Sequence, residues 1–196
     1  MIPVEILESY NCSKKEVSAG TFLFMEGENA HFYYQIFSGK VKMVNTNEEG
    51  KEFVQGTFKD GQSFGEPPLF QGREYPASAF AEVDTVLYSL PKDVFFELLS
   101  ENFEIHLKFT SILTKRLMYK AMMLREISNH DAKHRILALI DYMKDEFGQS
   151  NEAFEVNLTR QQLSEFLGIR VETVIRTVKQ LQEDGDVKII DRKIFR

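Results

Sequence analysis

Short apolar runs and polar turn sequences follow one another in the first half of the chain. Between residues 17 and 92, aromatic and β-branched residues form short runs, and Gly-containing turn sequences separate these runs. This arrangement is typical of short strands joined by tight turns. The runs that we expect to form strands are 22–24, 32–37, 41–44, 53–54 and 85–90. Many short strands at this spacing predict a β-barrel or a jelly roll.

The pattern changes after Pro91. No Gly or Pro interrupts residues 92–126, and helix-forming residues dominate there. Apolar residues recur at steps of three, four or their sums, which predicts a long amphipathic helix over 101–127. The members of this stripe are Phe103, Leu107, Leu113, Leu117, Ala121 and Leu124.

A helix that only covers a barrel does not need an apolar stripe along its whole length. We therefore expect the stripe to pair with a second copy as a parallel helix pair in a homodimer. The expected dimer contacts are Leu113, Leu117, Ala121 and Leu124.

A further helix is expected between the long helix and the C-terminal third. The sequence 128–131 offers capping side chains for its start. An apolar face then runs from Ile136 to Phe147, and Gly148 is a natural stop. Residues 149–152 read as a polar loop.

The most specific local pattern lies in residues 158–184. Thr159 can cap a short helix, Gly168 allows a tight turn, and small Ser164 sits where two helices must approach closely. Apolar residues at helical spacing face inward on both sides of the turn: Leu163, Phe166, Leu167, Val174, Val178 and Leu181. A short helix, a turn and a second helix predict a helix-turn-helix, and residues 185–196 read as a two-stranded wing after it.

The outward residues at the start of the second helix can read DNA bases. Glu172 can accept a hydrogen bond from a cytosine amino group, and Arg176 can donate to both guanine acceptors in the major groove. A helical pair with incidental surface charges is the plainer alternative. The polar outward face, the basic wing and the cap at Thr159 together favour DNA binding.

Composition narrows the function further. The 196 residues include 30 acids and 24 bases, for a net charge of −6. From Thr159 onward, however, eight Lys and Arg residues stand against six Asp and Glu residues, so the positive excess lies on the candidate DNA-binding end. No apolar run approaches the ~18 residues of a membrane span. The N-terminus shows no signal stretch, and we expect a cytoplasmic protein.

The two blocks together resemble the Crp-Fnr family of bacterial transcription regulators. Residues 159–163 and 168–176 follow the helix-turn-helix pattern of the family almost residue for residue. Residues 38–41 and 60–66 fall at the glycine turns of its double-stranded β-helix, a jelly-roll effector domain. The long stripe is similar to the dimerisation helix of the family.

The resemblance implies an α+β fold in three parts. These are a cyclic-nucleotide-binding-like β-roll effector domain over 1–100, a dimerisation helix over 101–128 and a winged helix-turn-helix over 129–196. It also implies that the protein is not an enzyme. The implied partners are double-stranded DNA with an inverted repeat, a second copy of the chain and RNA polymerase.

Roles of single residues follow from matched positions. The resemblance places Glu172 and Arg176 at base-reading positions, with Val171 beside them as in the Fnr branch of the family. An aliphatic side chain cannot donate to guanine, but it can contact a thymine methyl group. The residues that fall where the family contacts phosphates are Thr159, Arg160, Gln161, Arg170 and Thr173, and Lys193 in the wing is expected to act in the same way.

The expected effector pocket departs from the pattern of the nucleotide-binding members. The pair Gly65-Glu66 is present, but the Arg-Ser position falls within 75–78, where Ser78 remains and no Arg stands. A cyclic phosphate without this Arg loses its main charge-assisted contact, so we expect no binding of cyclic AMP or cyclic GMP. The candidate pocket residues are Gly65, Glu66, Phe70, Tyr75, Ser78 and Lys120.

Other sensor chemistries are open to different degrees. Cys12 is the single cysteine, which excludes a four-cysteine iron–sulfur cluster within one chain. His130 and His134 have a spacing that suits a metal or haem, but two His near a hinge are more often solvated or capping, and we expect no metal. Phe70 and Tyr75 can line an apolar effector site, and a degenerate pocket that binds nothing is a further alternative. The aromatic run 32–37 is expected to be barrel core rather than a ligand cage.

Two other function classes can be weighed against a DNA-binding regulator. A sensor that has lost DNA binding is disfavoured by Glu172 and Arg176 at reading positions. An enzyme on a cupin-like barrel needs several His ligands from the strands, and His31 alone lies in the β region.

Overall fold

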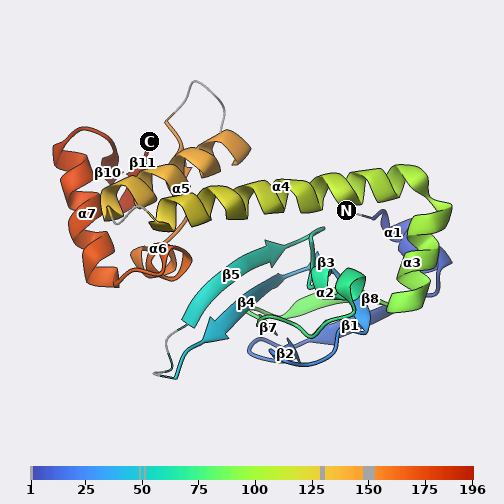
Figure 1. Cartoon of the computed structure of the whole chain (residues 1–196). Helices are drawn as coiled ribbons and strands as arrows, with labels where there is room; N and C mark the ends of the chain where they lie inside the picture. The colour runs from blue at the N-terminus through green and yellow to red at the C-terminus, as the bar shows by residue number, and fades with distance from the viewer. Residues whose placement is uncertain (1, 49, 51, 129–130, 148–152) are drawn as a thin grey trace. The chain divides into compact units, whose positions relative to one another are not determined.

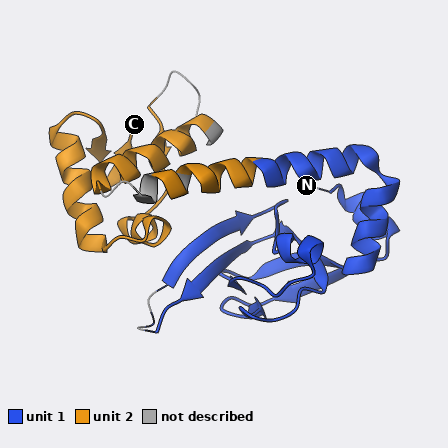
Figure 2. Ribbon diagram, viewed as in Figure 1, with its two compact units in different colours: residues 1–114 blue, residues 115–196 orange. Residues whose placement is uncertain are grey.

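The computed structural model describes residues 2–48, 50, 52–128, 131–147 and 153–196. The chain forms two compact units, Met1–Thr114 and Lys115–Arg196 (Figure 2). The expected capping residues Asn129 and His130, the expected stop at Gly148 and the loop 149–152 lie outside the described residues.

The first unit is built mainly from β-strands (Figure 1). Its elements are α1 (Val4–Ser9), β1 (Ser13–Val17), β2 (Phe22–Phe24), β3 (Phe32–Ser38), β4 (Lys40–Thr46), β5 (Glu52–Lys59), β6 (Ser63–Phe64), α2 (Pro67–Gln71), β7 (Ser78–Ala81), β8 (Thr85–Pro91), α3 (Lys92–Glu101) and the first part of α4 (Phe103–Ser128).

The strands form two antiparallel sheets, in the orders β1-β8-β3-β6 and β2-β7-β4-β5. Aromatic and aliphatic side chains from both sheets fill one core, with Tyr33, Ile36 and Leu87 fully buried. This double sheet confirms the predicted jelly-roll class. Within the aromatic run 32–37, Tyr33 and Tyr34 are buried, whereas Phe32 and Phe37 are partly exposed beneath the ammonium groups of Lys15 and Lys14.

The long helix begins after a break at Asn102. Residues 92–101 form a separate helix, α3, and Asn102 has φ −124° and ψ 77°, outside helical geometry. Its side-chain amide donates to the carbonyl of Leu98 at 2.9 Å, which closes the end of α3. Asn is a residue whose side chain competes with helix hydrogen bonds, so it ends the helix without Gly or Pro.

The second unit contains the remainder of α4 and a small helical domain. Its elements are α5 (Ala132–Phe147), β9 (Glu155–Val156), α6 (Arg160–Leu167), α7 (Val171–Glu183), β10 (Lys188–Ile190) and β11 (Lys193–Phe195). Leu163, Val174 and Leu181 meet Ile136 and Ile140 of α5 in its core. The strands order as β10-β11-β9, so the predicted wing gains a third strand.

The described helices include none that is both long and apolar enough to cross a membrane.

Candidate nucleic-acid interface and effector pocket

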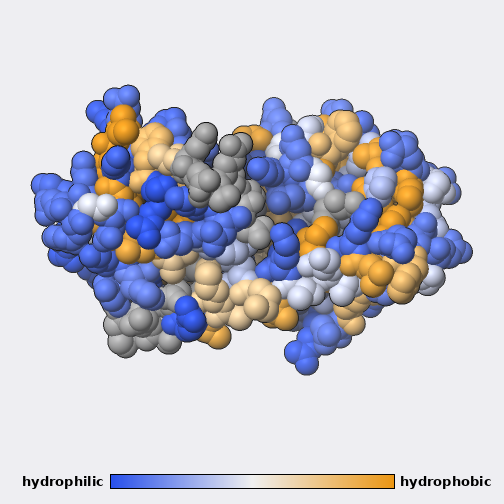
Figure 3. All heavy atoms as spheres, turned by 90° about the horizontal axis from the view of Figure 1, so that it is seen from above, coloured by the Kyte–Doolittle hydropathy of each residue, from blue (hydrophilic) through white to orange (hydrophobic). Residues whose placement is uncertain are grey.

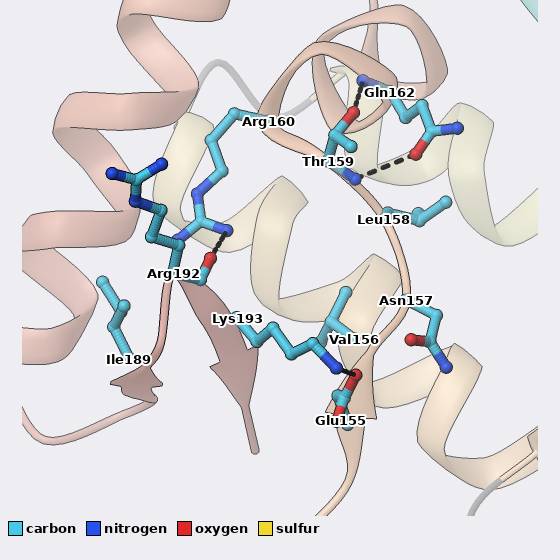
Figure 4. A pocket seen from close by; sticks show the side chains of 10 residues that line it. All are labelled: Glu155, Val156, Asn157, Leu158, Thr159, Arg160, Gln162, Ile189, Arg192 and Lys193. Carbon is cyan, nitrogen blue, oxygen red and sulfur yellow. Dashed lines mark hydrogen bonds and ion pairs between the residues drawn. The ribbon is translucent and has the colours of Figure 1, made fainter.

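A capping box fixes the start of α6. The amide of Gln162 donates to the Thr159 hydroxyl at 3.1 Å, and the amide of Thr159 donates to the Gln162 side chain at 2.9 Å (Figure 4). This reciprocal pair satisfies two donors at the helix start and confirms the predicted cap. The helix therefore begins at a defined residue beside the wing.

The turn between α6 and α7 is tight for two reasons. Gly168 has φ 63°, a left-handed conformation that most side chains disfavour. Ser164 is 5% exposed, and its hydroxyl donates to the carbonyl of Ile169 at 2.5 Å. The small hydroxyl thus joins the first helix to the turn, as the close approach of the helices predicts.

The exposed face of α7 holds the expected base-reading residues. Glu172 and Arg176 are exposed, and Val171 is half-buried at the first position of the helix. The opposite face of α7 is buried through Val174, Val178 and Leu181. The helix therefore presents polar groups to solvent on the side that a DNA groove could occupy.

Ile175 was not expected on this face. It is 54% exposed and lies three residues after Glu172 and next to Arg176. Residues three and four apart share one side of a helix, so Glu172, Ile175, Arg176 and the exposed Lys179 lie on one face. The amphipathic periodicity of α7 could have identified Ile175 and Lys179 as residues of this face.

The expected phosphate-contacting residues lie at the start of α6, at the start of α7 and in the wing. Gln161 and Arg170 are exposed, and Thr173 is half-buried. Arg160 is half-buried, and burial lowers the pKa of its guanidinium, although an Arg stays protonated in proteins. Lys193 extends from β11 and forms an ion pair with Glu155.

Several of these residues surround one open hollow of about 550 Å³ between the start of α6 and the wing (Figure 4). Thr159, Arg160 and Lys193 line it, together with Arg192, which the sequence did not single out. The Arg160 guanidinium donates to the carbonyl of Arg192 at 2.8 Å and so connects α6 to the wing tip. Glu172, Val171 and Arg176 do not line this hollow.

The wing tip adopts an uncommon backbone conformation. Asp191 and Arg192 have φ 48° and 66°, and neither is Gly. A two-residue type I′ hairpin turn requires positive φ at both of its residues, and Gly usually occupies at least one of the two positions. Arg192 thus places a charged side chain at a position where Gly would be easier to accommodate.

One face of α4 is exposed along the helix. Residues spaced alternately by four and three, which form the seam of a coiled coil, are all exposed. They are Phe103, Leu107, Thr110, Thr114, Leu117, Ala121 and Leu124. Figure 3 shows apolar side chains reaching the surface in several places on the face that it views. Leu113 lies elsewhere, since it packs partly against the core of the first unit.

Two of the expected pocket residues, Gly65 and Tyr75, lie at a stack of aromatic rings. Tyr75 stacks on Phe24 with ring centroids 3.6 Å apart and an interplanar angle of 8°. Phe24 also stacks on Tyr34 and Phe64 at 6.0 and 6.1 Å. Gly65 lies against this stack with φ +73°, and a Cβ there would come within 2.9 Å of the Phe24 ring.

The remaining pocket residues have separate surroundings. Glu66 is 1% exposed and accepts a hydrogen bond from the Ser63 hydroxyl. The Ser78 hydroxyl accepts from the amide of Glu26 at 2.9 Å. The Phe70 ring contacts the Phe96 ring, with centroids 5.0 Å apart, rather than the Tyr75 stack. Lys120 belongs to α4 in the second unit.

The Tyr75 hydroxyl is buried and has no hydrogen-bond partner among the described residues. Burial, with the nearby Tyr34 and Glu28, raises the pKa of Tyr75 above its ordinary value. An open hollow of about 590 Å³ lies beside this residue and includes Arg73, Glu26 and Glu74 in its lining. Glu26 and Glu74 therefore line the same hollow as Arg73, the Arg nearest in sequence to the expected phosphate position.

Side chains that could ligate a metal do not cluster in the described part of the chain. No group of three or more His, Cys, Asp or Glu side chains that could hold a metal ion occurs there. His134 is exposed on α5, and His130 lies outside the described residues.

Two family models match the chain. A cyclic nucleotide-binding domain matches residues 14–102, and a Crp-like helix-turn-helix domain matches residues 134–195. The cAMP-activated global transcriptional regulator CRP of Salmonella typhimurium is 26% identical over 178 residues, which are 89% of this chain and 85% of that protein. Electron transport regulator A of Shewanella oneidensis is 23% identical over 185 residues, or 93% of this chain and 74% of the relative.

Solved structures share the fold. The c-di-GMP responsive global regulator CLP of Xanthomonas campestris superposes with a TM-score of 0.76 at 21% identity, covering 98% of this chain and 96% of that one. A CooA mutant from Carboxydothermus hydrogenoformans gives a TM-score of 0.79 at 15% identity, covering 100% and 86%. At these identities the likeness concerns the fold.

Proposed function

We propose that this chain, which belongs to the Crp-Fnr family of transcription regulators, binds an inverted repeat in double-stranded DNA as a homodimer and responds to an unidentified effector. In this proposal residues 1–100 sense the effector, residues 101–128 join two subunits, and residues 129–196 bind DNA. RNA polymerase is the further partner that the resemblance implies. We propose no catalytic role.

The observation that supports DNA binding most strongly is the exposed face of α7. Glu172 and Arg176 are presented together at the start of a helix whose other side is anchored in the domain core. A helix held in this way can enter the major groove with its N-terminal residues at the base edges. The Arg fork suits guanine, and the Glu carboxylate suits a cytosine or adenine amino group on the facing strand.

Phosphate contacts would fix the orientation of α7. The hollow beside the wing brings Arg160, Arg192 and Lys193 to one surface, next to the capped start of α6. Cationic side chains and helix N-termini bind phosphate groups without reading sequence. We assign positioning to these residues and to Thr159, Gln161, Arg170 and Thr173.

The exposed seam of α4 supports the homodimer. Leu117 and Leu124 are 66% and 69% exposed in the single chain, an unusual position for large apolar residues. A parallel pairing of α4 with the α4 of a second copy would bury them. Leu113 would contribute only the part of its surface that the first unit leaves uncovered.

The effector is proposed to be something other than cyclic AMP. The relative from Salmonella typhimurium is described as cAMP-activated, but the Arg that would hold a cyclic phosphate is missing here. The stack of Phe24 on Tyr75 further occupies the interior of the roll next to Gly65.

A gel-shift experiment on genomic fragments tests the proposed function. The wild-type chain should retard a subset of fragments, and a Glu172→Ala, Arg176→Ala double variant should lose that selection while keeping weak binding to all fragments. A folded dimer that retards no fragment at moderate salt would favour the alternative, a sensor that has lost DNA binding.

A further inference from the structure

The wing contains an ion pair at the surface that is expected to meet DNA. The Lys193 ammonium lies 2.6 Å from a Glu155 carboxylate oxygen. The two side chains are 58% and 32% exposed, so solvent and ligands can reach the pair. Figure 4 shows both side chains at the edge of the hollow that also holds Arg160 and Arg192.

The sheet register explains why these two residues meet. Strand β9 pairs with β11, with Val156 opposite Ile194 and Glu155 opposite Phe195. Val156 and Ile194 are buried, so Glu155 and Lys193 both lie on the outward face. Lys193 is two residues from Phe195, which makes it a diagonal neighbour of Glu155 across the two strands.

Basic side chains outnumber acidic ones around the hollow. Among the described residues that line it, Arg160, Arg192 and Lys193 are basic and Glu155 is acidic. A carboxylate at this place neutralises one of three cations on a surface suited to phosphate. An exposed ion pair contributes about 0–1 kcal/mol, so a phosphate can displace the carboxylate from the ammonium.

We propose that Glu155 weakens DNA binding by competing with a DNA phosphate for Lys193. The inference rests on the proposed function. It assigns Glu155 a role in DNA binding, whereas the sequence pattern assigns none to this residue. In the free protein the carboxylate holds the ammonium. On DNA the phosphate takes the ammonium, and Glu155 remains close to the DNA as an unfavourable charge.

Competition for Lys193 should change the salt dependence of DNA binding, which a purely structural role of Glu155 would not do. Each protein cation that neutralises a phosphate steepens the dependence of log affinity on log salt by about 0.9. Lys193 paired with Glu155 adds little net charge, so its contribution to this slope is nearly cancelled. Removal of the carboxylate charge should restore the contribution.

The variant Glu155→Gln tests this directly, because the amide can still accept a hydrogen bond from Lys193 and has nearly the same shape. Fluorescence anisotropy with a short duplex of random sequence measures affinity over a range of salt concentrations. We expect affinity to rise about two- to fivefold per subunit at low salt, and the slope to steepen by about one per subunit.

Two further variants complete the experiment. Glu183→Gln makes the same charge change at the exposed C-terminal end of α7, and it should leave the slope nearly unchanged. In a Lys193→Gln background, Glu155→Gln should gain much less affinity than it does in the wild type, because the ion pair is already gone.

The results separate the inference from the proposed function. If the wild type binds the duplex and Glu155→Gln leaves affinity and slope unchanged, the competition is refuted and DNA binding stands. An equal slope change in Glu183→Gln would also refute it, because the effect would then be one of net charge. If no variant binds DNA at any salt concentration, the proposed function fails and this inference fails with it.

Discussion

Arg176 is exposed on α7, one helical turn after Glu172. A guanidinium that donates to both guanine acceptors discriminates against the wrong base by about 1–3 kcal/mol. We therefore expect Arg176→Ala to cost about 1–3 kcal/mol per half-site and to relax the preference at that guanine.

The matched comparison is Lys193→Ala in the wing. It should weaken binding to all sequences alike. It should flatten the salt slope by about one where Lys193 contributes fully, as in a Glu155→Gln background, and by less in the wild type, where Glu155 offsets its charge. Competition binding with operator and mutated duplexes distinguishes the two effects. Retention of the full guanine preference in Arg176→Ala would show that α7 is not the recognition helix.

Arg192 at the wing tip combines backbone strain with a charge. A left-handed L-residue costs about 1–2 kcal/mol, which Gly avoids. Arg192→Gly should therefore have a larger free energy of unfolding than Arg192→Ala, by about 1 kcal/mol, whereas both variants should lose similar DNA affinity. Urea denaturation and anisotropy measure the two quantities. Equal unfolding free energies in the two variants would show that the turn stores no strain.

At the scale of elements, local signals predicted the DNA-binding half well. Thr159, Gly168 and the inward apolar positions act within a few residues of one another, so the sequence alone indicates the capped helix and the turn. Strand β9 was missed because it has two residues, and its pairing with β11 depends on a contact across the domain. Strand β1 was missed because its exposed edge position lets polar residues form it.

The sequence alone did not determine which face of the long helix is exposed. The apolar stripe included Leu113, but the structure buries Phe109 and turns Leu113 toward the same core. Thr110 and Thr114 occupy the exposed seam instead. Steps of three and four fit more than one face of a helix, and only tertiary packing decides which face is covered.

Leu117 lies on this seam, and Leu117→Glu would place a charge in each half of a parallel helix pair. We expect monomers by light scattering, with loss of operator binding. Leu117→Met keeps an apolar side chain and should stay dimeric. A dimeric Leu117→Glu variant would exclude α4 as the interface between subunits.

At the scale of the whole molecule, the effector domain was predictable in its fold but less so in its interior. The glycine turns and strand spacing indicated the roll, whereas the stacking of Phe24 on Tyr75 joins residues far apart in the sequence. The sequence alone shows that the Arg expected to hold a cyclic phosphate is absent. The structure adds that rings fill the space beside Gly65 and that the Tyr75 hydroxyl is buried without a partner among the described residues.

Calorimetric titration of the full-length dimer with cyclic AMP should show no binding at micromolar concentrations. The charged phosphate would lack its Arg contact. The affinity of the wild type for operator DNA should accordingly be the same with and without cyclic AMP. A micromolar or tighter dissociation constant would contradict this account of the pocket.

Two recognition helices related by a two-fold axis must enter successive major grooves on one face of the DNA. The most direct test of a dimeric, sequence-reading regulator is therefore the selection of bound sites from random duplex DNA. We expect an inverted repeat with TTG in one half-site and its CAA complement in the other, and half-sites about one helical turn, or roughly 34 Å, apart. Enrichment of a single unpaired half-site, or of no motif at all, would contradict it.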